Sequence, residues 1–539
     1  MLNSAMSGSG VDRLPSWKFG PPCGWLILIV LAGALACADR DAIEHKRPPN
    51  IVIVVADDIG VDLVGAYARF YPPTPAPNTP YTPTIDRLAS EGLLFRNAWT
   101  NPGCSPTRSQ ILTGLHASRT GIGGNVSFTD FAKPAQKPGL AFGYTLLPQV
   151  LKSTPTPYDT AAVGKWYLAS PIQGPMHALG PSGAWFDRWA GSRFNLGGND
   201  SGYRKWRKTY ATSIRHGGGH ACGPPYPCSK IVSESKSCEQ YATVDTIDDA
   251  VHLVGTMTEP FLLYVAFNAA HGPLDLPNCV LPGSCSEGPL EPVAPVTKPE
   301  RTRAMVRTLD HQLGRLLCAI DDSDTVVIFI GDNGTAGDTR WGTPSGIVPP
   351  FPGKHGKGTT YQGGLNVPLI VRGPGVEPGI SDALVGSTDI LATVAELAGH
   401  SDPNGLTRDS ISWVPYHLND QRTSLRATVV GEIFTPIYTP VDVATGEPPK
   451  GYRSYHHRRA IRNDRFKLVE WYFNGKFTRD EFFDLLRGGP VGPNGAPTRD
   501  DFEQNDLIGS RADWPADGDI ERNHRALKAE LATTLPLLP

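Results

Sequence analysis

Short, wholly apolar runs rich in β-branched residues recur along the chain. Such runs are typical of strands that are buried on both faces of a parallel sheet. The clearest four cover residues 51–56, 160–163, 261–267 and 325–330. Between the last two, apolar residues from Met305 to Ile320 recur at helical spacing, which predicts an amphipathic helix against the sheet. We therefore predict an α/β fold with a mostly parallel central sheet flanked by helices.

The residues that follow these four strands have charged or polar side chains that can bind ligands or metal ions. Open α/β sheets bind ligands beyond the carboxyl ends of their strands. An acidic pair that follows one strand usually forms a turn. Four strands that all end in charged or polar side chains at the same edge of the sheet indicate a ligand-binding site instead. The oxygen ligands among them suit Ca²⁺ or Mg²⁺ better than a soft metal. In chain order the residues are Asp57, Asp58, Lys165, His271, Asp332 and Asn333.

The composition of the chain changes after about Asp402, where a Pro-rich connection begins. It leads into strand-like stretches at 427–433 and 459–471 and a final helix at 520–533. We interpret residues 47–402 as a catalytic domain and 403–539 as a smaller C-terminal α+β subdomain.

The N-terminus has the pattern of an export signal. Two cations precede an uncharged run over residues 24–36, which is shorter than the roughly 20 residues that cross a bilayer. Small residues precede Cys37, as in a bacterial lipoprotein cleavage site, and ordinary cleavage near Ala36 is the alternative. We expect residues 1–37 to be a signal peptide, with the lipoprotein type as one of the two alternatives. The protein would then be periplasmic or an outer-membrane lipoprotein anchored at Cys37 if bacterial, and secreted otherwise.

Charge and cysteine content restrict the partners and the redox environment. The formal net charge of −3 provides no global field to attract nucleic acid, so we expect no nucleic-acid partner. Export makes disulfides chemically possible. Cys222 with Cys228, and Cys279 with Cys285, are spaced to close short loops, although spacing does not fix connectivity. Cys318 falls on an apolar helix face, where we expect a buried thiol.

The segment Cys-Ser-Pro-Thr-Arg at 104–108 places Cys104 just ahead of a predicted helix. A helix N-terminus attracts anions, and Arg108 would reinforce that attraction. Alone, such a cysteine is more often a small buried residue. Followed by Ser-Gln-Ile-Leu-Thr-Gly, however, the segment resembles the signature of type I sulfatases, formylglycine-dependent arylsulfatases in which this cysteine is oxidised to formylglycine.

The resemblance extends from about Pro49 to Leu507. It implies an alkaline phosphatase-like fold. Further matches, in the order in which the family has them, are Asp-Asp at 57–58, Gly-Lys-Trp at 164–166, Ala-His-Gly-Pro at 270–273, Gly-Asp-Asn-Gly at 331–334 and the glycine-rich segment 356–364. Residues 460–468 and 483–485 resemble the closing sheet of the family.

The resemblance also implies the reaction: hydrolysis of an aryl or carbohydrate sulfate ester, after maturation by a formylglycine-generating enzyme. One hydroxyl of the hydrated aldehyde would attack sulfur, and loss of the proton from the other would expel sulfate. Arg108 would stabilise the modified residue, and His271 would protonate the departing alcohol. Lys165, His271 and Lys357 would surround the sulfate. A divalent cation, Ca²⁺ in preference to Mg²⁺, would be bound by Asp57, Asp58, Cys104, Asp332 and Asn333.

Two positions depart from the family pattern. Tyr167 stands where members commonly have the histidine that takes a proton during sulfate release, and Gln362 stands where glutamate is frequent. A phenol with a pKa near 10 is a poor base unless nearby cations lower that pKa, as Lys165, calcium and Arg108 could. Otherwise His177, His355 or water would take that proton. Two alternatives stay open: a phosphodiester or phosphonate monoester hydrolase of the same superfamily, and a turnover-deficient protein that binds sulfated glycans.

Two basic runs have two interpretations each. They are Tyr-Arg-Lys-Trp-Arg-Lys at 203–208 and His-His-Arg-Arg at 456–459. Most such runs are solvated faces. The alternative is a rim that guides an anionic substrate such as a sulfated sugar, with Trp206 stacking on it.

Overall fold

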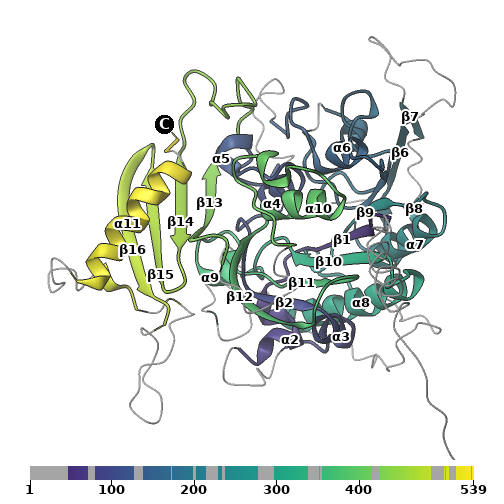
Figure 1. Ribbon diagram of the computed structural model, residues 1–539, viewed down its shortest axis with the longest axis horizontal. Helices are drawn as coiled ribbons and strands as arrows, with labels where there is room; N and C mark the ends of the chain where they lie inside the picture. The colour runs from purple at the N-terminus through teal and green to yellow at the C-terminus, as the bar shows by residue number, and fades with distance from the viewer. Residues whose placement is uncertain are drawn as a thin grey trace, which may run out of the picture. The chain divides into compact units, whose positions relative to one another are not determined.

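A large mixed sheet with helices on both faces and a separate four-stranded antiparallel sheet make up the fold (Figure 1). The computed structural model describes residues 47–70, 79–126, 138–170, 173–197, 202–213, 229–232, 237–238, 240–276, 297–337, 351, 355–414, 424–486, 503, 505–508, 518–535 and 537–538. The expected signal peptide with Cys37, and Cys222, Cys228, Cys279 and Cys285, lie outside these residues. Within the described part, every helix is too short or too polar to span a bilayer.

The large sheet has ten strands, and its centre is parallel. In spatial order the strands are β12 (Gly379–Gly386), β2 (Leu93–Trp99), β11 (Leu369–Arg372), β10 (Thr325–Gly331), β1 (Asn50–Ala56), β9 (Phe261–Ala266), β3 (Asp159–Gly164), β4 (Arg188–Gly191), β6 (Thr209–Ser213) and β7 (Ser229–Val232). The four strands predicted from apolar runs are β1, β3, β9 and β10, and they are neighbours in the order β10-β1-β9-β3. The predicted fold class is therefore confirmed, and the carboxyl ends of these four strands meet at one edge.

Each face of this sheet packs on its own apolar layer. One layer joins the sheet to α4 (Cys104–Thr113), α6 (Leu147–Lys152) and α10 (Asp389–Leu397), and the other joins it to α3 (Pro83–Glu91), α7 (Ala242–Val254) and α8 (Lys298–Ala319) (Figure 1). Helix α8 is the amphipathic helix predicted between β9 and β10, and Met305, Leu309 and Leu313 are fully buried. The expectation of a buried thiol at Cys318 is wrong. Cys318 lies on the exposed side of α8 and is disulfide-bonded.

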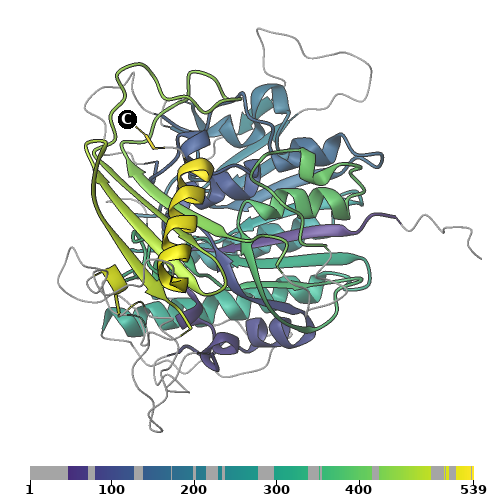
Figure 2. The same cartoon turned by 60° about the vertical axis from the view of Figure 1, so that its left-hand side comes forward.

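The four-stranded sheet follows in the chain as β13 (Val429–Thr435), β14 (His456–Arg462), β15 (Phe466–Phe473) and β16 (Lys476–Asp484). Its strands pair in sequence order, each antiparallel to the next. Helix α11 (Asp519–Thr534), the predicted final helix, covers one face of the sheet (Figure 2). The stretch predicted as one strand over 459–471 is instead the end of β14 and the start of β15. The chain reverses between them because the Asn463 side chain accepts hydrogen bonds from the backbone N–H groups of Arg465 and Phe466.

The basic run at 203–208 is not a stacking rim. Trp206 begins the short strand β5 (Trp206–Arg207), which pairs with β8 (Ser237–Cys238), and its indole is buried in the same apolar layer as Tyr203. Lys208 is also buried, with ion pairs to Asp245 (2.7 Å) and Asp249 (2.6 Å). The proposed role of Trp206 in stacking on a substrate is therefore wrong, because packing against the large sheet takes up its ring.

Candidate active site

Two adjacent parallel strands deliver the acidic residues to one point. β1 ends in Asp57 and Asp58, and β10 runs into Asp332 and Asn333. The backbone N–H of Asp58 donates to Asp332 Oδ1 at 3.1 Å. Asp58 has a φ of 58°, in the left-handed region that most residues avoid, and this turn keeps both carboxylates of the pair buried. All four predicted side chains therefore meet at this sheet edge.

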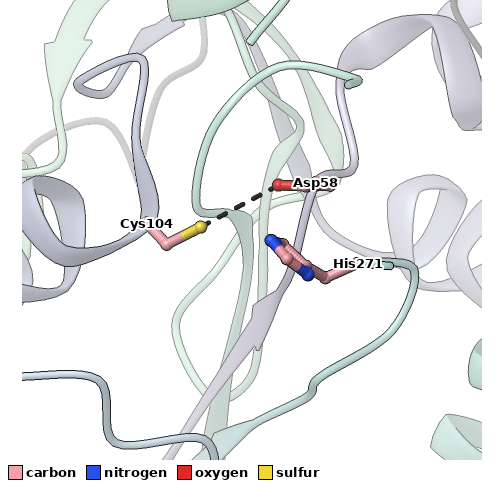
Figure 3. Close-up of side chains that lie close together, drawn as sticks. All are labelled: Asp58, Cys104 and His271. Carbon is pink, nitrogen blue, oxygen red and sulfur yellow. Dashed lines mark hydrogen bonds between the residues drawn. The ribbon is translucent and has the colours of Figure 1, made fainter. Parts of the chain in front are cut away.

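Cys104 is the first residue of α4 and is fully buried. Its Sγ lies 3.3 Å from Asp57 Oδ1. It also lies 3.9 Å from Asp58 Oδ1 (Figure 3). Lys357 Nζ donates to the same sulfur at 3.1 Å. The N-terminus of α4 thus points the thiol into the acidic cluster, in the position expected of a nucleophile.

Three cations balance the three carboxylates. The Arg108 guanidinium, one turn into α4, donates to Asp332 Oδ2 from Nε (3.2 Å) and Nη2 (2.9 Å). Lys165, directly after β3, pairs with Asp57, and Lys357 pairs with Asp58. Every ionic side chain of the cluster is therefore compensated.

The loop that carries Lys357 is anchored on both sides of the site. Lys357 N donates to Thr335 O at 3.0 Å, just beyond β10, and Gly358 N donates to Pro102 O at 2.7 Å, just before Cys104. These bonds fix the lysine relative to the strand end and to the helix start.

His271 follows β9 and faces the cysteine and Asp58 (Figure 3). One ring nitrogen, one carboxylate oxygen of Asp58 and Cys104 Sγ all lie within 4.8 Å of one another. Nδ1 lies 2.7 Å from Gly272 O, so it carries the proton and leaves Nε2 as the acceptor. The Tyr203 hydroxyl donates to His271 O at 2.9 Å and holds this loop. Nothing in the run at 203–208 distinguished this tyrosine as a support of the site.

Burial and the charges of neighbours set the titration of these groups. Burial by itself raises the pKa of Asp58, but the Lys357 ammonium outweighs it and holds that pKa well below its ordinary range. Burial and the adjacent Asp57 raise the pKa of Asp332 to about 6. Burial, followed by the charge of Lys357, lowers the pKa of His271 to about 3. Burial and Asp332 raise the pKa of the Cys104 thiol. The unmodified thiol is therefore a poor nucleophile at neutral pH.

The donor set fits a hard divalent cation. One ligand atom each from Asp57, Asp58, Cys104 and Asp332 lies within 4.8 Å of the others. Asn333 Nδ2 donates to Asp58 Oδ1 and to Gly334 O, each at 2.9 Å. Its Oδ1 is buried with no hydrogen-bond partner among the described residues. A buried amide oxygen beside three carboxylates is the environment that Ca²⁺ prefers.

A cavity of about 250 Å³ opens beside Asp58. Its walls are the loop after β9 and the start of α8, and they are largely apolar. The lining residues are Asp58, Ala270, Gly272, Pro273, Leu274, Lys298, Thr302, Thr335 and Ala336. The cavity therefore has room for a ring attached to a group held at the acidic cluster.

Tyr167 and His177 have different surroundings from those expected of a base. The Tyr167 hydroxyl accepts from Asn195 Nδ2 at 3.2 Å, and burial raises its pKa. His177 accepts from Trp166 Nε1 at Nδ1 (2.9 Å) and donates from Nε2 to Leu140 O (2.8 Å). The expectation that His177 takes the proton is wrong, because both of its ring nitrogens are occupied.

His355 and Gln362 belong to the support of the Lys357 loop. The His355 ring stacks on Tyr361 with centroids 3.8 Å apart. Gln362 Oε1 accepts from Trp99 Nε1 at 2.9 Å, while Gln362 N donates to the carboxylate of Glu503 at 2.6 Å. Glu503 thus places a carboxylate beside the position where the family pattern has glutamate.

Comparison with known proteins now identifies the family. The family model described as Sulfatase matches residues 49–400. The chain belongs to the sulfatase family. This sulfatase is 29% identical over 415 residues to N-acetylgalactosamine-6-sulfatase of Canis lupus familiaris, covering 74% of this chain and 71% of that protein. It is 29% identical over 403 residues to arylsulfatase A of Homo sapiens, covering 72% and 70% of the two chains.

Solved structures show the same fold. Ps i-CgsB in complex with a neocarrahexaose has a TM-score of 0.61 at 21% identity, covering 90% of this chain and 94% of that chain. BT4656 in complex with its substrate D-glucosamine-2-N,6-O-disulfate has a TM-score of 0.58 at 18% identity, covering 90% and 97%. The prediction of a type I sulfatase is confirmed, and the protein is an enzyme that hydrolyses sulfate esters.

Proposed function

We propose that this sulfatase cleaves an aryl or carbohydrate sulfate ester with a formylglycine made from Cys104 and with one bound Ca²⁺. The observation that carries the proposal is the position of Cys104 Sγ, 3.3 Å from Asp57 Oδ1 at the buried start of α4. The motif at 104–108 is the pattern that the modifying enzyme recognises in the family. An unmodified thiol with a raised pKa offers no comparable route to the chemistry.

The cation would be held by Asp57, Asp58, Asp332, Asn333 and the oxygen that replaces Cys104 Sγ. It would neutralise sulfate oxygens as a Lewis acid and orient the ester. Three cationic side chains already balance the three carboxylates, so a dication would leave the site positively charged. A positive site suits an anionic sulfate ester.

The chain's own residues supply the remaining steps. The hydrated formylglycine provides a hydroxyl for attack on sulfur and a second one whose deprotonation releases sulfate. Lys165 and Lys357 neutralise the sulfate oxygens, and Arg108 holds Asp332 in place. Nε2 of His271, which lies close to position 104, takes the proton that the attacking hydroxyl loses, and the nearby sulfate anion favours the imidazolium that forms. The imidazolium then donates that proton to the departing alcohol.

The cavity beside Asp58 would receive the alcohol of the ester. Its apolar wall at Pro273 and Leu274 suits the face of an aryl or sugar ring, and Thr302 and Lys298 offer polar contacts. The names of the relatives support this substrate class, since they include an arylsulfatase and a sulfatase of N-acetylgalactosamine 6-sulfate.

The proposed function is tested by peptide mass analysis around Cys104 together with hydrolysis of 4-nitrocatechol sulfate and of phenyl phosphonate esters. We expect formylglycine at position 104 in active preparations and faster hydrolysis of the sulfate. Cys104→Ala should abolish activity and leave the circular dichroism spectrum unchanged. An active preparation that retains the thiol would refute the formylglycine, and a preference for the phosphonate would refute the substrate class.

We also propose that the mature protein is exported. The disulfide at Cys318 supports this proposal, because such bonds persist in oxidising compartments. Fractionation of the native host with N-terminal sequencing would test it. Full-length protein in the cytoplasm would refute it, and a lipid-modified N-terminal cysteine would distinguish an anchor at Cys37 from ordinary cleavage.

A further inference from the structure

Part of one face of the C-terminal sheet is both basic and aromatic. Cross-strand pairing produces two adjacent three-residue rows on that face. Side chains two positions apart point to the same side of β14 and β15, and a bulge opposite Trp471 and Tyr472 brings Lys476 and Arg479 of β16, three positions apart, to that side as well. We call this surface the basic aromatic face. The outer row consists of His456, Phe473 and Lys476, and the next row consists of Arg458, Trp471 and Arg479.

Of the rings of this face, Phe473 is exposed and Trp471 is partly buried, and both are accompanied by cations. Phe473 is 51% exposed, and its ring centroid lies 5.1 Å from that of His456. The guanidinium carbons of Arg458 and Arg479 lie 3.9 and 4.3 Å from the centre of the Trp471 ring. Such contacts hold the guanidinium groups in place. The surface therefore presents ordered positive charge next to flat apolar rings.

Acidic side chains are scarce around this surface. Between residues 450 and 479, the exposed acid is Asp464, which lies in the turn at the opposite end of β14 and β15. Glu470 is buried on the other face in an ion pair with Arg459. Glu481 is largely buried at the inner edge of the rows, 3.1 Å from Arg479. The exposed cations in the same stretch are Lys450, Arg453, Lys476 and Arg479.

The rows lead toward the active site. The next row inward contains Glu481, whose Oε2 accepts from the Tyr361 hydroxyl at 2.8 Å. Tyr361 stacks on His355, two residues from Lys357. A chain with one residue held at Lys357 could therefore continue over the basic aromatic face.

We propose that the basic aromatic face binds a sulfated polysaccharide beyond the residue that is cleaved. The proposal rests on the proposed function for its substrate class. Sulfate groups pair with the cations, and the C–H face of a sugar ring packs on Phe473. The residues of the basic run at 456–459 alternate between the two faces of the sheet. His456 and Arg458 lie on this face, while His457 is buried 3.1 Å from Glu432 and Arg459 is buried beside Glu470.

The test measures binding of the Cys104→Ala protein to dextran sulfate, with uncharged dextran as the reference. Phe473→Ala combined with Lys476→Ala should weaken binding to dextran sulfate about fivefold, as expected for two modest contacts. The matched control is Phe477→Ala with Lys528→Ala. It removes the same residue types from the opposite face, where Lys528 Nζ lies 4.8 Å from the Phe477 ring. The control pair should change binding by less than about twofold.

Three results would overturn the proposal: an unchanged affinity in the Phe473/Lys476 variant, equal losses in both pairs, or loss of binding to phosphatidylglycerol vesicles with dextran sulfate binding intact. The last result would identify an anionic membrane as the partner. Hydrolysis of 4-nitrocatechol sulfate is measured separately with Cys104 intact. Absence of that activity, together with absence of sulfate release from dextran sulfate, would refute the proposed function and leave the binding result unaffected.

Discussion

Tyr167 occupies the position where the family pattern has histidine, and its surroundings restrict its role. Burial raises its pKa, and the Lys165 ammonium 4.5 Å from its ring does not reverse that shift. A neutral phenol can position a hydroxyl group but cannot remove its proton readily at neutral pH.

We therefore expect Tyr167→Phe to keep kcat within about tenfold of the parent, because it loses one hydrogen bond and no charge. Steady-state hydrolysis of 4-nitrocatechol sulfate measures this, with Tm as the control for folding. If sulfate remained covalently attached at position 104 in the folded variant, the phenol would be the base after all.

His177 has a role in stability that can be separated from turnover. Burial lowers its pKa to about 4, below the ordinary 6.5, so the folded state keeps it neutral. As pH falls below 6.5, His177 becomes protonated in the unfolded chain but stays neutral in the folded chain. The free energy of unfolding therefore decreases between pH 6.5 and 4. The shift in pKa corresponds to a loss of about 3 kcal/mol of unfolding free energy at pH values below 4.

His177→Gln should flatten this part of the pH profile of unfolding free energy, because glutamine does not titrate. Urea unfolding at pH 4.5 and pH 7.5 measures the difference, with kcat at pH 7.5 as the companion measurement. An unaltered pH profile, or a variant that accumulates sulfate ester, would contradict a purely structural His177.

Neighbouring strands explain why the acidic part of the site could be predicted from sequence. The strand-end residues Asp57, Asp58, Asp332 and Asn333 follow fully buried apolar runs, and the carboxyl ends of parallel neighbours meet at one edge. The antiparallel strands β2 and β11 were not predicted. β2 interrupts its apolar pattern with Arg96 and Asn97, and β11 has only four residues.

Side chains placed by tertiary packing could not be predicted in the same way. Trp206 and Tyr203 belong to a run whose local pattern indicates a solvated face, yet both rings pack against the large sheet. Likewise, the partners of His177 are separated from it by up to 37 positions in sequence. Contacts between residues that are distant in sequence cannot be predicted from the pattern of neighbouring residues.

Because β1 pairs with β10, the proposed Ca²⁺ site takes its ligands from both strands. Asp332→Asn should lower Ca²⁺ affinity by at least about tenfold, because it removes a buried charged ligand. Calcium content by elemental analysis, and the rise of Tm on adding Ca²⁺, measure this effect. Asp310→Asn is the control, since Asp310 is a buried carboxylate that accepts from Ile85 N (2.8 Å) away from the site. Equal calcium content in the two variants would contradict the assignment of Asp332.

The whole molecule depends on contact between its two sheets. Trp99, Leu365 and Leu384 from the large-sheet region form one apolar cluster with Ala460 and Val469 of the four-stranded sheet. Polar contacts cross the same junction, where Glu432 N donates to Asn101 Oδ1 at 3.0 Å and Ser118 N donates to Glu432 Oε1 at 2.7 Å. The segment 101–118 includes Cys104 and α4, so the four-stranded sheet supports the helix that carries the proposed nucleophile.

A chain truncated after residue 402 should therefore fail to fold, although the sulfatase family model ends at residue 400. Truncation would expose Trp99, Leu365 and Leu384, each at most 1% exposed in the full chain. Exposing each of these side chains to water lowers the free energy of unfolding by about 1.5–3 kcal/mol. The sum is a large part of a typical unfolding free energy of about 5–15 kcal/mol. Limited proteolysis and calorimetry of the soluble fraction test this, and removal of residues 1–46 alone, which leaves every described contact intact, is the control. A soluble truncated chain with a cooperative transition and bound Ca²⁺ would show that the large-sheet region folds without the four-stranded sheet.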